Sequence, residues 1–233
     1  MIRRLALAAA FLAVAPMGVA RSAADAPAAV APYVAAGAGG EVGEVRGIAH
    51  VEGRRPREVP TPVEGVSIYL LPFSRRLAEE LDEVKRTHRD GGRAYLESGP
   101  QLVEARERYE RILLAAGGGT LIRGEVSDAT GAFRFAEVPA GAWMLLAWKA
   151  TAHPLTGKKL TGVEVRQFRD NAERTGYAAV TYWRASVDVA AGVTSEIVLR
   201  DRNEWMTAIE EERHVPGEDT RRGNQKRGRG ASR

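Results

Sequence analysis

Three aromatic side chains in the C-terminal part of the chain are the leading candidates for binding a ligand: Tyr177, Tyr182 and Trp205. A flat, exposed ring can stack on the CH face of a sugar, while amides and carboxylates beside it bind the hydroxyls. The same three rings could instead pack in an ordinary hydrophobic core. We therefore predict a ligand-binding role for Tyr177, Tyr182 and Trp205, with core packing as the alternative.

Metal and nucleophile chemistry finds little support in the sequence. The four histidines, His50, His88, His153 and His214, include no pair with the spacing of two metal ligands on one helix or strand. The chain has no cysteine, and it lacks the G-x-S-x-G and G-x-x-x-x-G-K-[ST] motifs. We predict no catalytic residue, no metal and no cofactor. The alternative for a metal is that His50 and His153 meet in the fold.

Apolar and polar residues alternate in several short stretches, as they do in half-buried strands. These stretches are 44–51, 66–72, 120–127, 132–135, 142–150, 178–189 and 194–201. Asp128 and Gly131 lie between two of them and predict a tight turn, because Asp can bind backbone amides of its own turn and glycine accepts a positive φ.

The segment 74–118 changes to helical spacing and predicts a helical hairpin inserted between strands. Its apolar stripes hold Leu77, Leu81 and Val84 in the first helix and Leu102, Ala105, Tyr109 and Ile112 in the second. Ser74 can cap the first helix and Ser98 the second, with Gly91 and Gly92 between them. A charged loop is the alternative to the hairpin.

Both ends of the chain differ from the middle. Residues 1–20 have two arginines, a short apolar run and small residues at 18 and 20, which is the pattern of a cleaved signal peptide. Residues 21–43 are rich in Ala, Gly and Pro and predict a flexible linker, while 203–212 predicts a short helix. The tail 213–233 holds seven basic and two acidic residues, and we expect it to be disordered.

Three stretches resemble carboxypeptidase-regulatory-like domains, which form a transthyretin-like or prealbumin-like family. The family pattern P-x-x-G-V-x-V-x-L-x-P is similar to PVEGVSIYLLP at 62–72. The signature T-D-x-x-G-x-F-x-F-x-x-V-P-x-G-x-Y-x-L-x-A is similar to SDATGAFRFAEVPAGAWMLLA at 127–147, with Trp143 in place of the usual Tyr. VDVAAGVTSEIVL at 187–199 resembles the closing strands. The resemblance implies a mainly β fold, a seven-stranded antiparallel β-sandwich, which we place at 44–202 around the inserted hairpin.

Two enzyme families with a related fold are not matched in their functional residues. Intradiol dioxygenases bind iron through two tyrosines and two histidines, with an H-x-H pair after the P-G-x-Y corner, whereas here the single histidine His153 follows the corner closely and no H-x-H pair is present. Hydroxyisourate hydrolases end in Tyr-Arg-Gly-Ser, which this chain lacks. We therefore predict that the protein is not an enzyme.

The stretch 142–150 is apolar on both faces, so something must cover the second face. The outward side chains of this stretch and of 66–72 are Tyr69, Leu71, Met144, Leu146 and Trp148. The hairpin leaves the chain directly after 66–72, and we predict that it folds back over them. An external partner on this face is the alternative.

These features together predict an exported, non-catalytic β-sandwich module, periplasmic or extracellular, for structural, adhesive or ligand-binding work at the cell envelope. The alternatives are a carbohydrate-binding module and, after that, a divergent enzyme of the prealbumin-like fold. We expect an envelope protein or a polysaccharide as partner, no nucleic acid, and no membrane span in the mature chain.

Overall fold

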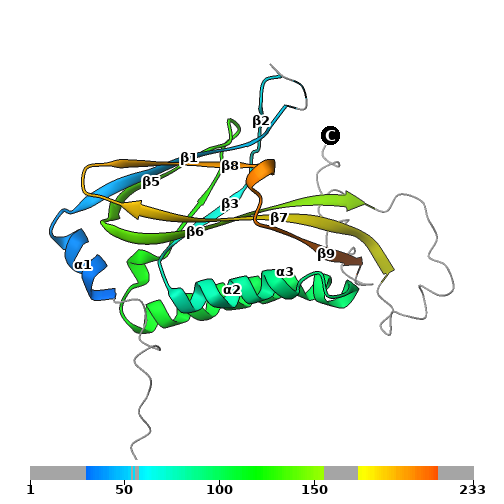
Figure 1. Ribbon diagram of the computed structural model, residues 1–233, viewed down its shortest axis with the longest axis horizontal. Coiled ribbons are helices and arrows are strands. Elements are labelled where there is room, and N and C mark those ends of the chain that lie inside the picture. The colour runs from blue at the N-terminus through cyan, green and yellow to red at the C-terminus, as the bar shows by residue number, and fades with distance from the viewer. Residues whose placement is uncertain (1–29, 54, 56–57, 155–172, 215–233) are drawn as a thin grey trace, which may run out of the picture.

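The computed structural model describes residues 30–53, 55, 58–154 and 173–214, which form two packed β-sheets with two helices outside one of them (Figure 1). The first sheet contains β1 (Val42–Val51), β2 (Thr61–Pro62), β5 (Ala132–Pro139) and β8 (Thr194–Arg200). The second sheet has the order β4 (Arg123–Val126), β3 (Ser67–Pro72), β6 (Gly141–Pro154), β7 (Glu173–Val189) and β9 (Met206–His214). The predicted mainly β sandwich with a helical insertion is confirmed.

The strand pairing departs in two ways from the predicted set of seven antiparallel strands. Nine strands lie within the described residues, because β9 extends the second sheet and the short β2 joins the first. One pair is parallel. The chain crosses from β7 in the second sheet to β8 in the first, and β8 runs beside β1 in the same direction. β1 therefore pairs with both β8 and the antiparallel β5 and is the central strand of the first sheet.

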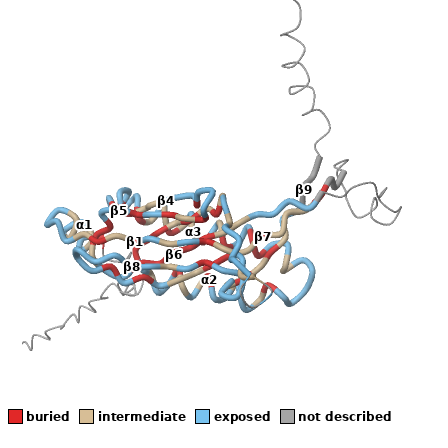
Figure 2. Tube along the Cα trace, turned by 90° about the horizontal axis from the view of Figure 1, so that it is seen from above, coloured by how far each residue is buried: buried red, intermediate tan, exposed pale blue. Residues whose placement is uncertain are grey.

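One part of the core lies between the two sheets, and Figure 2 shows buried residues along strands of both sheets and along the hairpin. Val45 of β1 and Ile68, Leu70, Trp143 and Leu145 of the second sheet are all fully buried. The indole of Trp143 donates a hydrogen bond from Nε1 to the carbonyl oxygen of residue 139 at 2.9 Å, so its polar atom is satisfied inside the core.

The turn between β4 and β5 forms as the sequence predicts. Oδ1 of Asp128 accepts hydrogen bonds from the backbone amides of Thr130 at 2.8 Å and Ala132 at 3.0 Å. Gly131 has a φ of +77°, and a Cβ there would lie 2.1 Å from the carbonyl oxygen of Ala49. Glycine is required at this position for both reasons.

The inserted hairpin consists of α2 (Arg75–Thr87) and α3 (Gly92–Ala115), and it lies against the outer face of the second sheet (Figure 1). On that face Leu71, Met144 and Leu146 are buried, with exposed fractions of 0%, 2% and 9%. The hairpin contributes Leu77, Leu81, Leu102, Ala105, Tyr109 and Leu113 to the same cluster. Each large apolar side chain buried in this way contributes about 1.5–3 kcal/mol before entropy is counted. The prediction that the hairpin covers this face is confirmed.

The ends of the two helices match the sequence in one case and not in the other. Ser74 caps α2, with its hydroxyl accepting a hydrogen bond from the amide of Leu77 at 3.3 Å. α3 begins at Gly92 rather than at the predicted cap Ser98, which lies inside the helix and donates to the carbonyl of Tyr95 at 2.8 Å. The longer α3 contacts β9 and contains Pro100 in its interior.

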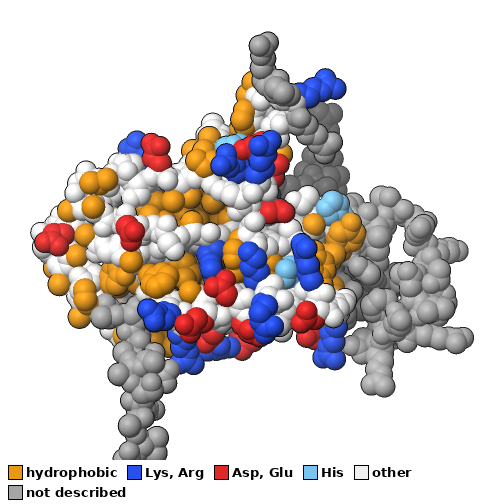
Figure 3. Space-filling view, in the orientation of Figure 1, with side chains coloured by type: hydrophobic (Ala, Val, Ile, Leu, Met, Phe, Trp, Pro, Cys, Tyr) orange, Lys and Arg blue, Asp and Glu red, His pale blue; other side chains and the backbone are white. Residues whose placement is uncertain are grey.

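The outward side of the hairpin is charged, with both signs intermingled along the lower edge of the molecule in Figure 3. Arg108 bridges the two helices there, because its guanidinium binds Glu80 of α2 and Glu104 of α3, each at 3.0 Å. The hairpin thus presents an apolar face to the sheet and a polar face to solvent.

The predicted linker at 21–43 is wrong for its described part. Val30–Ala38 forms α1, and β1 starts at Val42. Alanine favours helix, Gly39 and Gly40 follow the helix end, and the ring of Tyr33 packs edge-on against Trp143 with 5.2 Å between ring centres. A tertiary contact that the sequence pattern did not reveal therefore holds this segment to the sandwich.

The predicted C-terminal helix at 203–212 is also wrong, because the chain from Met206 forms β9. Met206 and Ala208 are buried while Thr207 between them is only partly buried, which is the alternation of a strand. The edge of β7 offers backbone hydrogen bonds from Glu173 to Tyr182, and β9 pairs with it there in the antiparallel direction. The signal peptide at 1–20 and all but the first two residues of the tail at 213–233 lie outside the described residues.

Candidate functional site

The structure brings two of the three predicted ligand-binding residues together and places the third elsewhere. Tyr182 on β7 and Trp205 just before β9 are neighbours, since the amide of Trp205 donates to the carbonyl of Tyr182 at 2.8 Å. Tyr177 lies farther along β7, where its ring stacks on His153 of β6 at 4.9 Å between centres. Ligand binding by these residues stays a prediction, and their positions constrain it.

Tyr182 has little surface to offer a ligand, because α3 covers it. Its exposed fraction is 6%, and a Cβ at Gly99 would lie 3.1 Å from the Tyr182 hydroxyl. Burial, with a smaller contribution from Glu210, raises the pKa of Tyr182 to about 12. The Tyr182 ring therefore acts mainly as a packing surface for α3.

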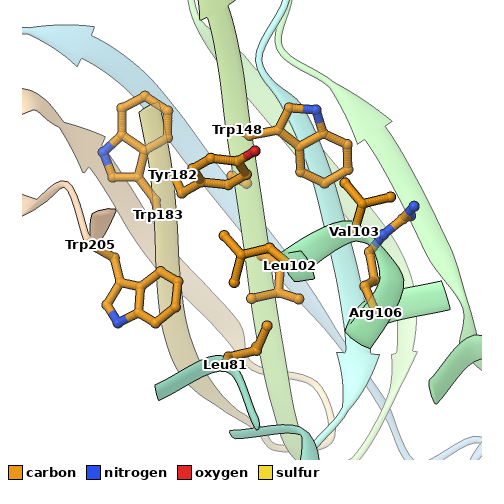
Figure 4. A pocket seen from close by; sticks show the side chains of 10 residues that line it. Leu81, Leu102, Val103, Arg106, Trp148, Tyr182, Trp183 and Trp205 are labelled. Carbon is orange, nitrogen blue, oxygen red and sulfur yellow. The ribbon is translucent and has the colours of Figure 1, made fainter. Parts of the chain in front are cut away.

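A small pocket lies between the hairpin and the second sheet, as Figure 4 shows. Leu81 and Leu102 form its helical side, and Tyr182, Trp183 and Trp205 line its sheet side. Its volume is about 30 Å³. That space accommodates roughly one or two water molecules, so no sugar ring enters while the hairpin is in place.

Trp148, which lines this pocket, and Tyr69, which stacks on it, are already covered by a cation of the protein. Tyr69 and Trp148 stack with 5.2 Å between ring centres, and Arg106 of α3 lies over them at 4.2 Å and 5.3 Å. Arg106 is held in turn by Glu110, at 2.9 Å. A cation over a shielded ring contributes on the order of 1–2 kcal/mol. These contacts fasten the hairpin and close the rings to a stacking ligand from that side.

A larger cavity, which we call the end cavity, lies where α1 meets the sandwich. Its volume is about 540 Å³, within the range of roughly 300–1,000 Å³ that small-molecule pockets occupy. Its lining includes Tyr33 of α1, Thr120 and Leu121 of the short 3-10 helix η2 (Gly119–Leu121), Arg123 of β4, and Glu137 and Pro139 of β5. The end cavity is therefore a hollow of ligand size in the described part of the chain, and it combines apolar walls with convergent polar groups.

One wall of the end cavity is a β-bulge in β5. Gly43 pairs with Val138 and Val45 with Phe135, so that two residues of β5, 136 and 137, stand opposite the single residue between Gly43 and Val45. Glu137 has a φ of 53°, a left-handed conformation that costs a residue with a Cβ about 1 kcal/mol or more. Bulges redirect side chains, and this one places the exposed Glu137 at the cavity.

Arg123 holds the bulge from the other sheet. Its Nη1 donates to the carbonyl oxygen of Ala136 at 2.6 Å and its Nη2 to that of Glu137 at 2.8 Å. Burial lowers the pKa of the Arg123 guanidinium, and the negative charge of Glu137 partly offsets this. A cation bound to two carbonyls in this way contributes about 1.5–3 kcal/mol per bond, enough to maintain the strained conformation of Glu137.

Tyr33 of α1 forms the aromatic wall of the end cavity. Its hydroxyl donates to the carbonyl of Ala142, and a Cβ at Gly141 would lie 2.7 Å from its ring, so the ring lies directly over glycine backbone. Burial raises the pKa of Tyr33. The aromatic wall of the end cavity is thus preformed.

The residues that sequence reasoning missed are Tyr33, Arg123 and Glu137. Tyr33 lay in the segment interpreted as a linker, and nothing in the sequence marks residue 137 as left-handed. Among the described residues no group of three or more His, Asp or Glu side chains is arranged to hold a metal ion. No helix in the described ranges is long and apolar enough to cross a membrane.

Comparison with known proteins gives similarity only at the level of solved structures. No family model and no curated protein matches the chain, so the resemblance to carboxypeptidase-regulatory-like domains stays a prediction. A proposed carbohydrate-binding protein from Pseudomonas aeruginosa is 13% identical, with 69% of this chain and 88% of that chain covered and a TM-score of 0.37.

Two pilus proteins are similar to the chain at a still lower level. The pilus backbone RrgB from Streptococcus pneumoniae is 12% identical over 68% of this chain and 40% of that chain, with a TM-score of 0.26. The minor pilin GBS52 from Streptococcus agalactiae is 10% identical over 67% and 94%, also with a TM-score of 0.26. Similarity this low leaves the function to be argued from the chain's own residues.

Proposed function

We propose that the protein is an exported, non-catalytic module of the cell envelope that binds a small ligand in the end cavity. Of the structural, adhesive and ligand-binding roles expected from the sequence, the geometry favours the last. The observation that carries the proposal is the open hollow of about 540 Å³ lined by residues of α1, η2, β4 and β5. Its size, its apolar walls and its few polar groups are the usual features of a binding site.

The walls of the end cavity are held in place without a ligand, which favours binding. Arg123 fastens the bulge through two carbonyls, and the Tyr33 hydroxyl is bound to the backbone of Ala142. Little conformational entropy is then lost when a ligand enters, so even a few contacts give measurable affinity. The pocket under the hairpin is not preformed in this way, because its volume of about 30 Å³ would have to increase before a ligand could enter.

A test of this proposal fills the cavity with a larger side chain. Thr120 is exposed and lines the end cavity, so Thr120→Trp places an indole where a ligand would lie. Thr194→Trp, on exposed β8 in the first sheet, is the matched control. Saturation-transfer NMR with a mixture of neutral sugars, small carboxylic acids and amines should give signals for at least one class with wild type and with Thr194→Trp, and none with Thr120→Trp. Signals that survive Thr120→Trp, or no signals from wild type, would contradict the proposal.

A further inference from the structure

The side chain of Glu137 does not favour the left-handed backbone conformation that residue 137 adopts. Glycine is the residue that takes a left-handed φ without strain, as Gly131 and Gly192 do elsewhere in this chain at +77° and +70°. A corner that only had to turn would be more stable with glycine at position 137. The carboxylate is therefore retained at a position that disfavours it, and it faces the end cavity.

The charges of the cavity lining balance. Arg123 is the only basic residue and Glu137 the only acidic residue among the described residues that line it. The Arg123 guanidinium gives hydrogen bonds to two carbonyls and has no carboxylate within ion-pair distance in the described part of the chain. An anionic ligand would be repelled by the Glu137 carboxylate, and a cationic ligand would be repelled by the Arg123 guanidinium. A neutral ligand avoids both conflicts.

The remaining groups determine what kind of neutral ligand fits. Glu137 accepts hydrogen bonds, Arg123 can only donate them, and the Thr120 hydroxyl does both. The ring of Tyr33 and the side chains of Leu121 and Pro139 supply apolar surface. A molecule that has several hydroxyls along one edge and CH groups on its faces satisfies all of these groups together, and this is the chemistry of a sugar.

We propose that the end cavity takes a neutral carbohydrate and that Glu137, presented by the strained bulge, accepts hydrogen bonds from its hydroxyls. This inference rests on the proposed function, because it names the ligand class of the same cavity. It differs from the sequence-based hypothesis of sugar stacking on Tyr177, Tyr182 and Trp205, none of which lines the end cavity.

Two substitutions at one position test the role of Glu137. Glu137→Gly removes the carboxylate and relieves the left-handed strain, so the melting temperature should rise while sugar binding is lost. Glu137→Gln keeps the shape and removes the charge, and it should weaken binding about tenfold or more, since hydrogen bonds to a charged acceptor are the stronger ones. Glu196→Gln, at an exposed position on β8, is the matched control and should bind as wild type.

The probes are neutral di- and trisaccharides of glucose, galactose and N-acetylglucosamine, with digalacturonate as the anionic and glucosamine as the cationic sugar, measured by titration calorimetry. Neutral probes should bind more tightly than both charged ones. Tight binding of a neutral sugar that Glu137→Gln leaves unchanged would overturn the inference, and so would a lower melting temperature for Glu137→Gly.

The outcomes separate this inference from the function on which it rests. If only small carboxylic acids or amines bind, and Thr120→Trp abolishes that binding, the end cavity is a ligand site but the carbohydrate inference is wrong. If no probe of any class binds wild type, both are wrong. Sugar binding that depends on Glu137 and is blocked by Thr120→Trp supports both.

Discussion

The guanidinium of Arg184 on β7 lies over the indole of Trp205, with 4.8 Å from Cζ to the ring centre. The same group binds the carboxylate of Asp82 on α2 at 2.8 Å and donates to the carbonyl of Ala78 at 3.2 Å. The ammonium of Lys85 also lies over this ring, at 5.3 Å. One side chain of the sheet thus connects β7, the start of β9 and the middle of α2.

Arg184→Ala should loosen α2 without unfolding the sandwich. It removes an ion pair, a hydrogen bond to a carbonyl and a cation–π contact at a position only partly exposed, so the free energy of unfolding should fall by about 1–3 kcal/mol. Urea unfolding measures the loss in the free energy of unfolding. The substitution should increase the rate of hydrogen exchange, relative to wild type, more in residues 75–87 than in β6. Arg93→Ala removes an ion pair whose arginine is 89% exposed and should change little. Equal losses for the two variants would contradict the assigned role.

The parts of the fold that could be predicted from sequence are those fixed by local chemistry. The alternation of side chains in β3 and β6 predicts the two faces of the second sheet. Because both faces of β6 are apolar, the helical pattern next to β3 predicts a hairpin that packs on the outer one. The turn at Asp128–Gly131 follows from what Asp and Gly can do alone. Ser74 is a cap for the same reason.

The parts that could not be predicted depend on partners far away in the chain. α1 is ordered by the contact of Tyr33 with Trp143, more than a hundred residues later, and an Ala- and Gly-rich segment gives no sign of it. Trp205, Met206 and Ile209 have spacing compatible with one helical turn, but the free edge of β7 decides for a strand. The conformation of Glu137 depends on Arg123 from the other sheet, so the candidate site had no signal in the sequence.

The exposed face of the first sheet carries a carboxylate whose ionisation should govern acid stability. Glu44 on β1 is bound by Arg46 on the same strand and by Arg134 on β5, the latter at 2.7 Å. Hydrogen bonds first from Arg46 and then from Arg134 lower the pKa of Glu44 from 4.5 to about 2. Because the folded-state pKa is the lower one, the stabilisation is present above pH 4.5 and is lost as the pH falls toward 2.

Glu44→Gln should therefore flatten the acid limb of the stability profile. Urea midpoints of wild type should fall between pH 4.5 and about 2, and the variant should show a shallower decline over the same interval. Glu204→Gln, whose carboxylate is not part of this cluster, should keep the wild-type profile. A variant at position 44 that declines as steeply as wild type would show that Glu44 does not contribute.

The signal peptide predicted at 1–20 can be tested by what a producing cell exports. Expression of the full chain in a Gram-negative bacterium should yield protein in the periplasm or the medium whose N-terminal sequence begins at Arg21, after the small residue Ala20. Replacing Gly18 and Ala20 by Leu should block cleavage and leave the longer form with the membrane fraction. Recovery of uncleaved wild-type chain from the cytosol would contradict export, and with it the envelope part of the proposed function.

Asn203 occupies backbone groups of β8, a strand that pairs only with β1 in the described part of the chain. Its side-chain Nδ2 donates to the carbonyl of Val198 and its Oδ1 accepts from the amide of Arg200, both at 2.7 Å. The carbonyl of Arg200 is taken by Nε1 of Trp183 at 2.9 Å. Free groups at a strand edge invite pairing with a second chain, and these bonds remove three of them.

Asn203→Ala should therefore make the protein self-associate. Two backbone groups of β8 become available next to Val198, whose exposed fraction is 42%, so a second copy can add its own edge strand there. Sedimentation velocity should show a species that grows with concentration in the variant and is absent or weaker in wild type. Thr194→Ala, at the exposed start of the same strand, is the control and should sediment as wild type. An unchanged sedimentation coefficient for Asn203→Ala across the concentration series would show that other features, such as the charges of Glu196 and Arg200, protect this edge.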